Sequence, residues 1–322
     1  MKAIRLNETG GPEVLSYEEV PLPEPEAGQA RVKIEAIGVN FIETYQRSGQ
    51  YPVSLPFAIG QEAAGVVEMV GADVGNVRVG DRVAWAMQSG SYAEAAVIDA
   101  NALVTVPEGV ETRTAAAVLL QGMTAHYLSM SLYPIKAGDD VLIHAAAGGV
   151  GALLTQMAKK QGARVFGTVS NEEKAEIARA AGIDEVIFYT KTNFTQEVRR
   201  LTDGAGVNVV YESVGKETFE QSLDSLKPRG YLVLFGQSSG AVAPVNPQVL
   251  NQKGSLFLTR PTLGHYIASR EELDWRAGDL FRWINDGSLQ VRIDTTFALA
   301  DAAEAHRYLE ARQTKGKVLL IP

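Results

Sequence analysis

Three small residues, Ala146, Gly148 and Gly151, stand at the spacing that lets a chain turn tightly around a phosphate group. They lie between the apolar run LIH and the amphipathic run ALLTQMAK, within residues 142–159. Small side chains are needed here because the backbone must approach the phosphates and the helix must pack close to the strand. The first N–H groups of the helix then face an anion. The pattern predicts a dinucleotide diphosphate site, with close helix packing alone as the alternative.

The end of the next expected strand indicates which dinucleotide binds. A site for NAD places an Asp or Glu there, about 20 residues after the glycines, to accept a hydrogen bond from the ribose 2′-hydroxyl. This chain has Ser170 and Asn171 at that point, and Lys174 follows one helical turn later. An ammonium group can pair with a 2′-phosphate, so NADPH is predicted in preference to NADH. Lys174 could instead be a solvated helix charge beside Glu172 and Glu173.

Alternating strands and helices from residue 140 onward must position this turn. Apolar runs typical of buried strands are separated by helix-length segments, and six strands are expected between residues 140 and 260. Such strands form a parallel sheet covered on both faces, and six of them complete a doubly wound dinucleotide fold. Residues 217–230 are expected to form one of the helices. Residues 1 to about 120 are rich in Pro, Gly and short alternating runs, which is typical of a strand-rich domain. The tail after residue 260 is expected to pack back onto that domain.

Composition narrows the classes of function. The 322 residues exceed what one hydrophobic core normally organises, which favours two domains. A formal net charge of -8 disfavours binding to nucleic acid. The absence of cysteine excludes disulfides, Cys nucleophiles and thiolate metal sites. No apolar run approaches the roughly 20 residues that span a bilayer, and the first residues lack the apolar core of a signal peptide, so a cytoplasmic location is expected.

Several segments together resemble the medium-chain dehydrogenase/reductase superfamily: the glycine turn, LPFAIGQEAAGVVEMVG, VGDRVAWA and LLQGMTAHYL. The runs GVNFIETYQRSGQYP and FGQSSGAV resemble its zinc-free quinone oxidoreductases, the zeta-crystallin branch. The resemblance covers the whole chain. It implies an α/β protein with a GroES-like, β-rich catalytic domain (residues 1–122, completed by 262–322) and a Rossmann NADPH-binding domain (residues 123–261). It also implies a homodimer formed through the sixth strand, SLFLT, since an uncovered edge strand invites uncontrolled pairing.

The resemblance implies an NADPH:quinone oxidoreductase that works in a cleft between the two domains. It places Asn40, Tyr45, Tyr51 and Gln61 at the quinone, where amide and phenol groups can donate hydrogen bonds to a developing quinolate. Turn packing is the alternative role for the two tyrosines. The cofactor contacts that it implies are Asn40, Gln121, Thr124, Ala147, Gly148, Gly149, Val150, Ser170, Asn171, Lys174, Tyr189, Phe235, Gly236, Ser238 and Ser239.

The same resemblance raises the question of a metal. Zinc-dependent relatives have a Cys near position 40 and a His-Glu pair after the glycine that here is Gly60, whereas this chain has Asn40 and Gln61. Its histidines are His126, His144, His265 and His306. They show no ligand spacing, so no metal is predicted, because a catalytic zinc needs three protein ligands around an open position. His144 is expected to be packed and hydrogen-bonded, and Glu62 to be structural rather than a general base.

Two other functions stay open. An NADPH-dependent reductase of activated alkenes, such as enones or alkenals, uses the same hydride geometry, and the loops that set pocket width cannot be placed from sequence. A non-enzymatic NADPH- or RNA-binding role is the third hypothesis, although an acidic chain without a Lys/Arg-rich run argues against RNA. Quinone reduction is favoured because a quinone is already a strong electrophile and needs no metal to activate it. Arg260, after the sixth strand, could approach substrate or cofactor and receives no role.

Overall fold

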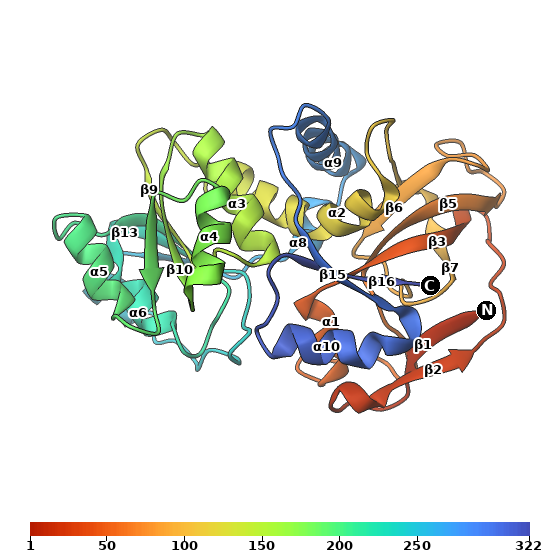
Figure 1. Cartoon of the computed structure of the whole chain (residues 1–322), viewed down its shortest axis with the longest axis horizontal. Helices are drawn as coiled ribbons and strands as arrows, with labels where there is room; N and C mark the ends of the chain where they lie inside the picture. Colours follow the sequence, from red (N-terminus) through yellow and green to blue (C-terminus); the bar gives the residue numbers. More distant parts are fainter. The chain divides into compact units, whose positions relative to one another are not determined.

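The computed structural model describes residues 1–322 and divides the chain into two compact units. Unit 1 comprises Met1–Met123 and Tyr266–Pro322, and unit 2 comprises Thr124–His265. Both chain ends therefore belong to unit 1 (Figure 1). None of the helices combines the length and apolar character that a membrane crossing requires.

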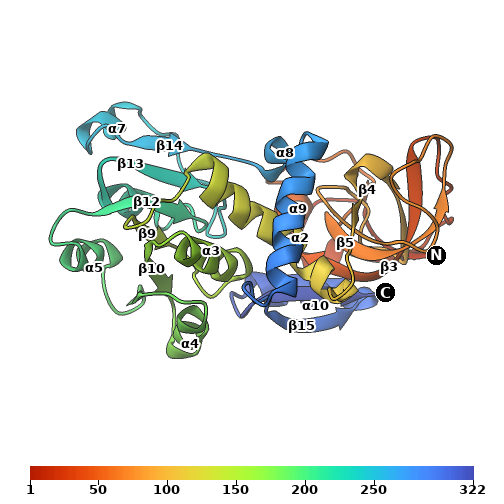
Figure 2. The same ribbon diagram turned by 90° about the horizontal axis from the view of Figure 1, so that it is seen from above.

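Unit 2 contains a parallel sheet of six strands in the order β11-β10-β9-β12-β13-β14 (Figure 2). This is the order of the doubly wound dinucleotide folds, so the predicted fold class is confirmed. The elements are β9 (Asp140–Ile143), α3 (Gly149–Lys160), β10 (Arg164–Val169), α4 (Glu172–Ala180), β11 (Glu185–Phe188), α5 (Phe194–Leu201), β12 (Val207–Glu212), α6 (Phe219–Asp224), β13 (Leu226–Leu234), α7 (Gln248–Gln252) and β14 (Phe257–Thr259).

Local sequence explains where the helices of unit 2 begin and end. The side chain of Asn171 accepts a hydrogen bond from Lys174 N at 3.0 Å and so caps the start of α4. Gly162 and Gly182 follow α3 and α4 with φ of 81° and 97°, a left-handed conformation that ends a helix at no steric cost for glycine. Residues 141–143 of β9 are fully buried, as expected for a strand covered on both faces.

The prediction of a helix over residues 217–230 is wrong for the second half of this segment. α6 ends at Asp224, and β13 already begins at Leu226, which pairs with Val207 of β12. Leu226 is buried in the core of unit 2, so its packing favours the strand. Pro228 lacks an N–H and Arg229 has a φ of 62°, and neither is compatible with a continuing helix.

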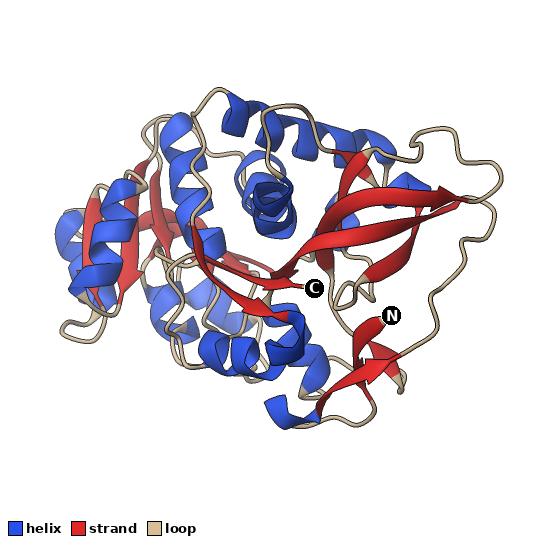
Figure 3. Ribbon diagram, turned by 45° about the vertical axis from the view of Figure 1, so that its right-hand side comes forward, coloured by secondary structure: helices blue, strands red, loops and turns tan.

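Unit 1 is built from two sheets. The larger has the order β15-β16-β3-β5-β6-β8, with β7 also paired to β3, and the smaller has the order β2-β1-β4. Its strands are β1 (Lys2–Leu6), β2 (Leu15–Glu19), β3 (Gln29–Val39), β4 (Phe57–Ala58), β5 (Glu62–Val70), β6 (Arg82–Ala86), β7 (Ala95–Asp99), β8 (Val104–Thr105), β15 (Ile293–Ala298) and β16 (Lys317–Ile321). Figure 3 draws strands in red and helices in blue. β16 pairs antiparallel with β3, which confirms that the tail packs back onto the first domain.

Unit 1 also contains helices. They are η1 (Pro12–Val14), α1 (Phe41–Arg47), η2 (Ala100–Ala102), α9 (Arg270–Asn285), η4 (Leu299–Asp301) and α10 (Ala302–Glu310). α2 (Thr112–Tyr127) crosses from unit 1 into unit 2 and continues as η3 (Leu128–Leu132), and α8 (Leu263–Tyr266) makes the return crossing. The strand-rich pattern did not predict α1. This helix begins with a capping box, in which Glu43 Oε2 accepts a hydrogen bond from Asn40 N at 2.7 Å.

Candidate functional site

The turn between β9 and α3 has the geometry of a phosphate-binding loop. Gly148 stands at the N-cap of α3 and offers no side-chain acceptor to the first N–H groups of the helix. A Cβ atom at Gly151 would lie 2.3 Å from Ala145 O, so only glycine allows the helix to pack this close to the turn. Gly148, Gly149 and Val150 remain partly exposed, and Ala147 is buried. This arrangement can bind an anion through backbone N–H groups.

The residues predicted near the 2′-phosphate lie at the start of α4 and after β11. Ser170 O accepts a hydrogen bond from Thr190 Oγ1 at 2.9 Å, which joins these two segments. Asn171 uses its side-chain oxygen to cap α4 at Lys174 N. Tyr189, next to Thr190, is 41% exposed. The structure therefore gathers Ser170, Asn171 and Lys174 at one helix start, with Tyr189 on the adjoining loop.

Two loops at the carboxyl ends of β12 and β13 are tied together through their backbones. The predicted residues here are Phe235, Gly236, Ser238 and Ser239. Glu212 O accepts hydrogen bonds from Phe235 N at 2.9 Å and from Gly236 N at 3.3 Å. Val214 O accepts from Ser239 N at 2.8 Å and from its Oγ at 2.7 Å. Ligands of doubly wound sheets bind at this carboxyl edge.

Gln121 and Thr124 stand three residues apart on α2 and therefore on one face of it. Gln121 is half-buried and Thr124 is buried. Their side chains share this face, but they belong to different units of the chain.

His144 is packed and hydrogen-bonded, as predicted. Its Nδ1 lies 2.9 Å from Thr168 Oγ1 and its Nε2 lies 2.9 Å from Ser222 Oγ. Ser222 Oγ in turn donates to Glu212 Oε2 at 2.6 Å, so it accepts from His144. Burial lowers the pKa of His144, which keeps the ring neutral. This buried network ties four elements of unit 2 together beneath the carboxyl edge of the sheet.

Aromatic side chains form a row in unit 1. The ring centroids of Tyr45 and Tyr51 are 5.2 Å apart, and those of Phe41 and Tyr45 are 6.2 Å apart. Tyr51 N donates to Tyr45 O at 2.9 Å, which holds the loop after α1 against the helix. Tyr45 is buried and Tyr51 is half-buried. Such rings provide apolar faces for a planar ligand and phenol groups for hydrogen bonding.

Asn40 and Gln61 have their amide groups engaged by the protein. Asn40 Nδ2 donates to Glu62 Oε2 at 3.0 Å and to the carbonyl two residues earlier at 3.3 Å. Its Oδ1 accepts from Lys317 Nζ at 2.7 Å, and an ammonium group, which cannot accept, fixes the amide orientation. Gln61 Nε2 donates to Ser89 Oγ at 3.0 Å. Both predicted residues therefore lie beside a buried polar cluster.

Glu62 is the centre of this cluster, and its burial and contacts agree with the predicted structural role. The side chain is 0% exposed, and that of Lys317, its ion-pair partner through Oε2, is 1% exposed. Oε1 accepts from Leu120 N at 2.6 Å. A Cβ atom at Gly38 would lie 2.2 Å from Glu62 Oε2, so the carboxylate needs a glycine on the neighbouring strand. Both carboxylate oxygens of Glu62 therefore accept hydrogen bonds from protein groups.

Glu43 adds a second carboxyl group to the same buried region. Oε2 accepts from Asn40 N at 2.7 Å and Oε1 accepts from Gln61 N at 3.0 Å. Burial raises the pKa of Glu43 to about 8, against the opposing effect of the Lys317 ammonium. Glu43 thus links the backbones of the two amide residues Asn40 and Gln61.

A second buried network of unit 1 surrounds His306. Its Nδ1 lies 3.2 Å from Arg47 Nη1, and its Nε2 lies 3.1 Å from Tyr92 OH. Arg47 also pairs with Glu310 at 2.6 Å. Burial, with a contribution from the Arg47 charge, lowers the pKa of His306 to about 3. The network anchors α1 to α10 and contains none of the predicted site residues.

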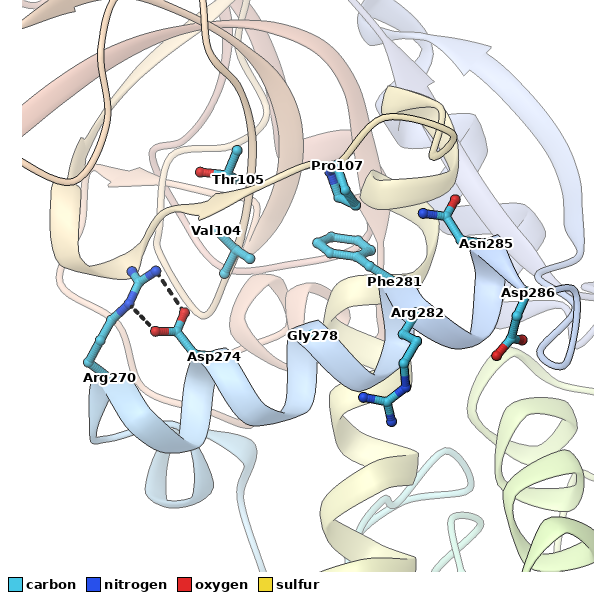
Figure 4. Close-up of a pocket in the computed structure, with 10 residues that line it drawn as sticks. All are labelled: Val104, Thr105, Pro107, Arg270, Asp274, Gly278, Phe281, Arg282, Asn285 and Asp286. Carbon is cyan, nitrogen blue, oxygen red and sulfur yellow. Dashed lines mark hydrogen bonds and ion pairs between the residues drawn. The ribbon is translucent and has the colours of Figure 1, made fainter.

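A surface hollow of about 710 Å³ lies along α9 in unit 1 (Figure 4). Its lining includes Phe281, whose ring faces Pro107, and the ion pair between Arg270 and Asp274. None of the predicted site residues lines it. Arg270 pairs with Asp274, and Arg282 pairs with Asp279 of the same helix.

Comparison with known proteins identifies the family. Residues 26–108 match the family described as alcohol dehydrogenase GroES-like domain, and residues 149–279 match the family described as zinc-binding dehydrogenase. A quinone oxidoreductase of Pseudomonas aeruginosa is 48% identical over 100% of this chain and 99% of its own. The chain belongs to the quinone oxidoreductase family of medium-chain dehydrogenases/reductases. The structure of Escherichia coli quinone oxidoreductase complexed with NADPH matches with a TM-score of 0.98, at 44% identity over 100% of both chains.

A further relative of this chain widens the range of chemistry within the family. A 2-haloacrylate reductase of a Burkholderia species is 42% identical over 98% of each chain. The resemblance inferred from the sequence motifs is confirmed by these matches. The family accordingly includes proteins named for two kinds of electron-poor substrate.

The description of the second matched family raises the question of zinc, and the residues present do not fit this metal. Amides stand at Asn40 and Gln61, whereas zinc sites use thiolate, imidazole and carboxylate ligands. The neighbouring carboxylate of Glu62 is bound by Lys317 and Leu120 N. No group of three or more His, Cys, Asp or Glu side chains is arranged to hold a metal ion.

Sequence reasoning missed the buried partners of the predicted residues. Glu43 could have been found, because the run NFIE has the spacing of a capping box. Lys317 could not, because the start of a terminal strand gives no indication of its partner. It meets Asn40 and Glu62 only because β16 pairs with β3.

Proposed function

We propose that this protein reduces quinones with NADPH. The observation that carries the proposal is the full-length match to a quinone oxidoreductase whose structure contains NADPH. The phosphate turn at Gly148 and the aromatic row at Tyr45 and Tyr51 agree with it. NADPH supplies a hydride from its nicotinamide ring.

Unit 2 provides most of the groups that would bind the cofactor. The first N–H groups of α3 would hold the diphosphate, and Lys174 would pair with the 2′-phosphate near Tyr189. The loop after β13, which carries Phe235, Gly236, Ser238 and Ser239, would border the nicotinamide ribose and carboxamide. Gln121 of unit 1 and Thr124 of unit 2 would contact the cofactor near its nicotinamide and diphosphate from α2.

Unit 1 provides the groups that would receive the quinone. Tyr45 and Tyr51 would pack against the quinone ring and donate hydrogen bonds where negative charge develops on oxygen. Asn40 and Gln61 would act mainly by position, since their amide hydrogens are bound within the protein. No side chain in this group has the placement of a dedicated proton donor, so water would protonate the product.

Consumption of NADPH tests the proposed function directly. Purified protein is given NADPH with a small quinone, an enone or an aldehyde, each in the presence of a chelator. We expect turnover with the quinone to exceed that with the aldehyde by several orders of magnitude and to be unaffected by the chelator. Activity restricted to the aldehyde, or abolished by chelation, would contradict the proposal.

Reduction of activated alkenes is a second candidate. The observation that favours it is the relative named 2-haloacrylate reductase, which is similar over nearly the whole chain. The same assay separates the two candidates, because a catalytic efficiency on the enone or on a haloacrylate above that on the quinone would make the alkene the substrate class.

The choice of NADPH over NADH depends in this proposal on Lys174. Replacement with Glu should weaken NADPH binding by about one to two decades, because it removes a charge-assisted contact with the 2′-phosphate and adds repulsion. NADH binding should change little. Lys136→Glu, an exposed charge reversal elsewhere in unit 2, is the matched control. Equal affinity of the Lys174→Glu variant and the wild type for NADPH would remove this assignment.

A homodimer formed through β14 is part of the proposal. β14 has a neighbour on one side only, and Phe257 on it is 49% exposed and stacked on Tyr231 at 4.5 Å. Pairing with β14 of a second copy would cover this edge. Light scattering should give twice the chain mass of 34.6 kDa, and Phe257→Lys should lower it toward the monomer. A monomer mass for the wild type would contradict the proposed homodimer.

A cytoplasmic location also belongs to the proposal, because a reductase of this kind needs access to the reduced cofactor pool of the cell. Cell fractionation with a tagged chain tests it, and recovery outside the cytoplasmic fraction would contradict it.

A further inference from the structure

The carboxylate of Glu212 supports the loop that follows β12 from below. Its side chain is 0% exposed and stands at the last residue of the strand. Oε1 accepts hydrogen bonds from Val214 N at 2.7 Å and from Gly215 N at 3.0 Å. These two bonds close the chain into a tight turn directly over the carboxylate.

The other oxygen of Glu212 is held by the buried network of His144. Oε2 accepts from Ser222 Oγ at 2.6 Å and lies 3.5 Å from His144 Nε2. Burial raises the pKa of Glu212, but His144, Ser222 and the backbone N–H of Gly215 outweigh it and hold the pKa below its usual range. Since His144 is neutral, we attribute this lowering mainly to the hydrogen bonds. The carboxylate is therefore ionised and held in place, because both of its oxygens accept hydrogen bonds from protein donors.

The turn held by Glu212 is in close contact with the loop that follows β13. Val214 O accepts from both N and Oγ of Ser239. Gly215 has a φ of 89°, and a Cβ atom there would lie 2.7 Å from Gly240 O. The position of one loop therefore fixes that of the other. The loop after β13 carries four residues assigned above to the nicotinamide end of the cofactor.

We propose that Glu212 is a positioning residue for the nicotinamide end of NADPH: its buried carboxylate fixes the turn at Val214 and Gly215 and, through it, the loop at Ser239. The inference rests on the proposed function, because that function supplies the cofactor and the direction in which it lies. The new element is the role of Glu212: this residue touches no ligand, yet it selectively affects the binding of one end of the cofactor.

Two isosteric variants separate the acceptor from the bulk of the side chain. Glu212→Met keeps the length but leaves Val214 N and Gly215 N without an acceptor. Glu212→Gln keeps one oxygen for these N–H groups, while Ser222 Oγ can turn to accept from the new amide. Ser222→Ala is the control for stability alone, because it perturbs the buried network and leaves Oε1 in place.

Calorimetric titration with two ligands gives a readout that a general loss of structure would not produce. In the proposed site NADPH reaches the loops after β12 and β13, whereas 2′,5′-ADP carries only the adenosine part of the cofactor with its 2′- and 5′-phosphates. For Glu212→Met we expect NADPH affinity to fall on the order of tenfold, while 2′,5′-ADP affinity stays within about twofold of the wild type. Glu212→Gln and Ser222→Ala should stay near the wild type for both ligands.

The outcomes distinguish this inference from the proposed function. Equal weakening of both ligands by Glu212→Met, or unchanged NADPH binding in the folded variant, would overturn the positioning role and leave the reductase proposal intact. Failure of the wild type to bind NADPH would overturn both. If Glu212→Met does not fold, Gly215→Ala displaces the same turn through its contact with Gly240 O, and it should show the same selective loss. An equal loss of both ligands in that variant would also count against the inference.

Discussion

Each unit of the molecule buries a polar cluster next to its predicted binding residues, but the two clusters differ in charge. In unit 1, the ammonium of Lys317, the carboxylate of Glu62 and the carboxyl group of Glu43, whose pKa is raised to about 8, are buried together. In unit 2, a single carboxylate, Glu212, is bound by hydroxyl and backbone donors beside a neutral His144. The first cluster connects distant parts of the chain through opposite charges, whereas the second connects neighbouring strands through hydrogen bonds.

The difference shows two physical ways to hold a binding surface in place. A buried ion pair stabilises the fold only while both partners are present. If one partner is removed, the remaining buried charge lowers the free energy of unfolding strongly. A carboxylate that is held by several hydrogen-bond donors loses about one bond at a time when single donors are removed. We therefore expect unit 1 to respond abruptly to single substitutions and to pH, and unit 2 to respond gradually.

The largest effect is expected from Lys317→Met, which leaves Glu62 buried without its cation. The free energy of unfolding of unit 1 should fall by about 3 to 5 kcal/mol. Urea unfolding followed by tryptophan fluorescence measures it, because Trp85, Trp275 and Trp283 all lie in unit 1. The double variant Glu62→Gln with Lys317→Met should recover most of the loss. A cost of less than about 1 kcal/mol for the single variant would show that the pair is not the basis of the difference.

Glu43 should make unit 1 less stable as the solution becomes alkaline. Its folded pKa of about 8 lies above its ordinary value of 4.5, so its stabilising contribution is complete below pH 4.5 and is lost as pH rises toward 8. Between pH 5 and 8 the loss should approach about 3 kcal/mol. Glu43→Gln should unfold with a smaller dependence on pH over this range in the fluorescence assay. An identical slope for variant and wild type would contradict the assignment.

His306 should have the opposite dependence on pH. Its folded pKa of about 3 lies below its ordinary value of 6.5, so its contribution to stability is complete above pH 6.5 and is lost as pH falls toward 3. At pH 5 the loss should be about 2 kcal/mol. His306→Gln keeps an acceptor for Arg47 and a donor for Tyr92 and should remove this acid sensitivity. Equal acid sensitivity of the variant would assign the effect to other groups.

The smallest effect is expected in unit 2, from Ser222→Ala. It removes the hydroxyl between His144 and Glu212 and should cost about 1 to 2 kcal/mol, because one donor is lost and the rest of the network remains. Thermal unfolding followed by circular dichroism measures it, and the tryptophan transition of unit 1 serves as the internal control. A loss as large as that of Lys317→Met would remove the contrast between the two clusters.

The amino-acid sequence by itself determined the doubly wound unit and the glycine turn between β9 and α3. Apolar runs, caps such as Asn171 and the glycines at 148 and 151 act within a few residues of each other, so local patterns were sufficient. The same reasoning extended a helix through residues 226–230, where burial of Leu226 beside Val207 favours a strand. Long-range packing overrode the local pattern at that point.

Only the tertiary structure decided what surrounds the predicted residues. Asn40 and Gln61 were chosen by type and position, but the structure engages their amides in a cluster with Lys317, which is 277 residues from Asn40 in the sequence. Glu212 likewise meets Ser222 and His144 only after the strands of unit 2 have paired. Local sequence patterns determine the conformation of a segment. The partner of a buried charge, in contrast, is determined by the pairing of strands that are distant in the sequence.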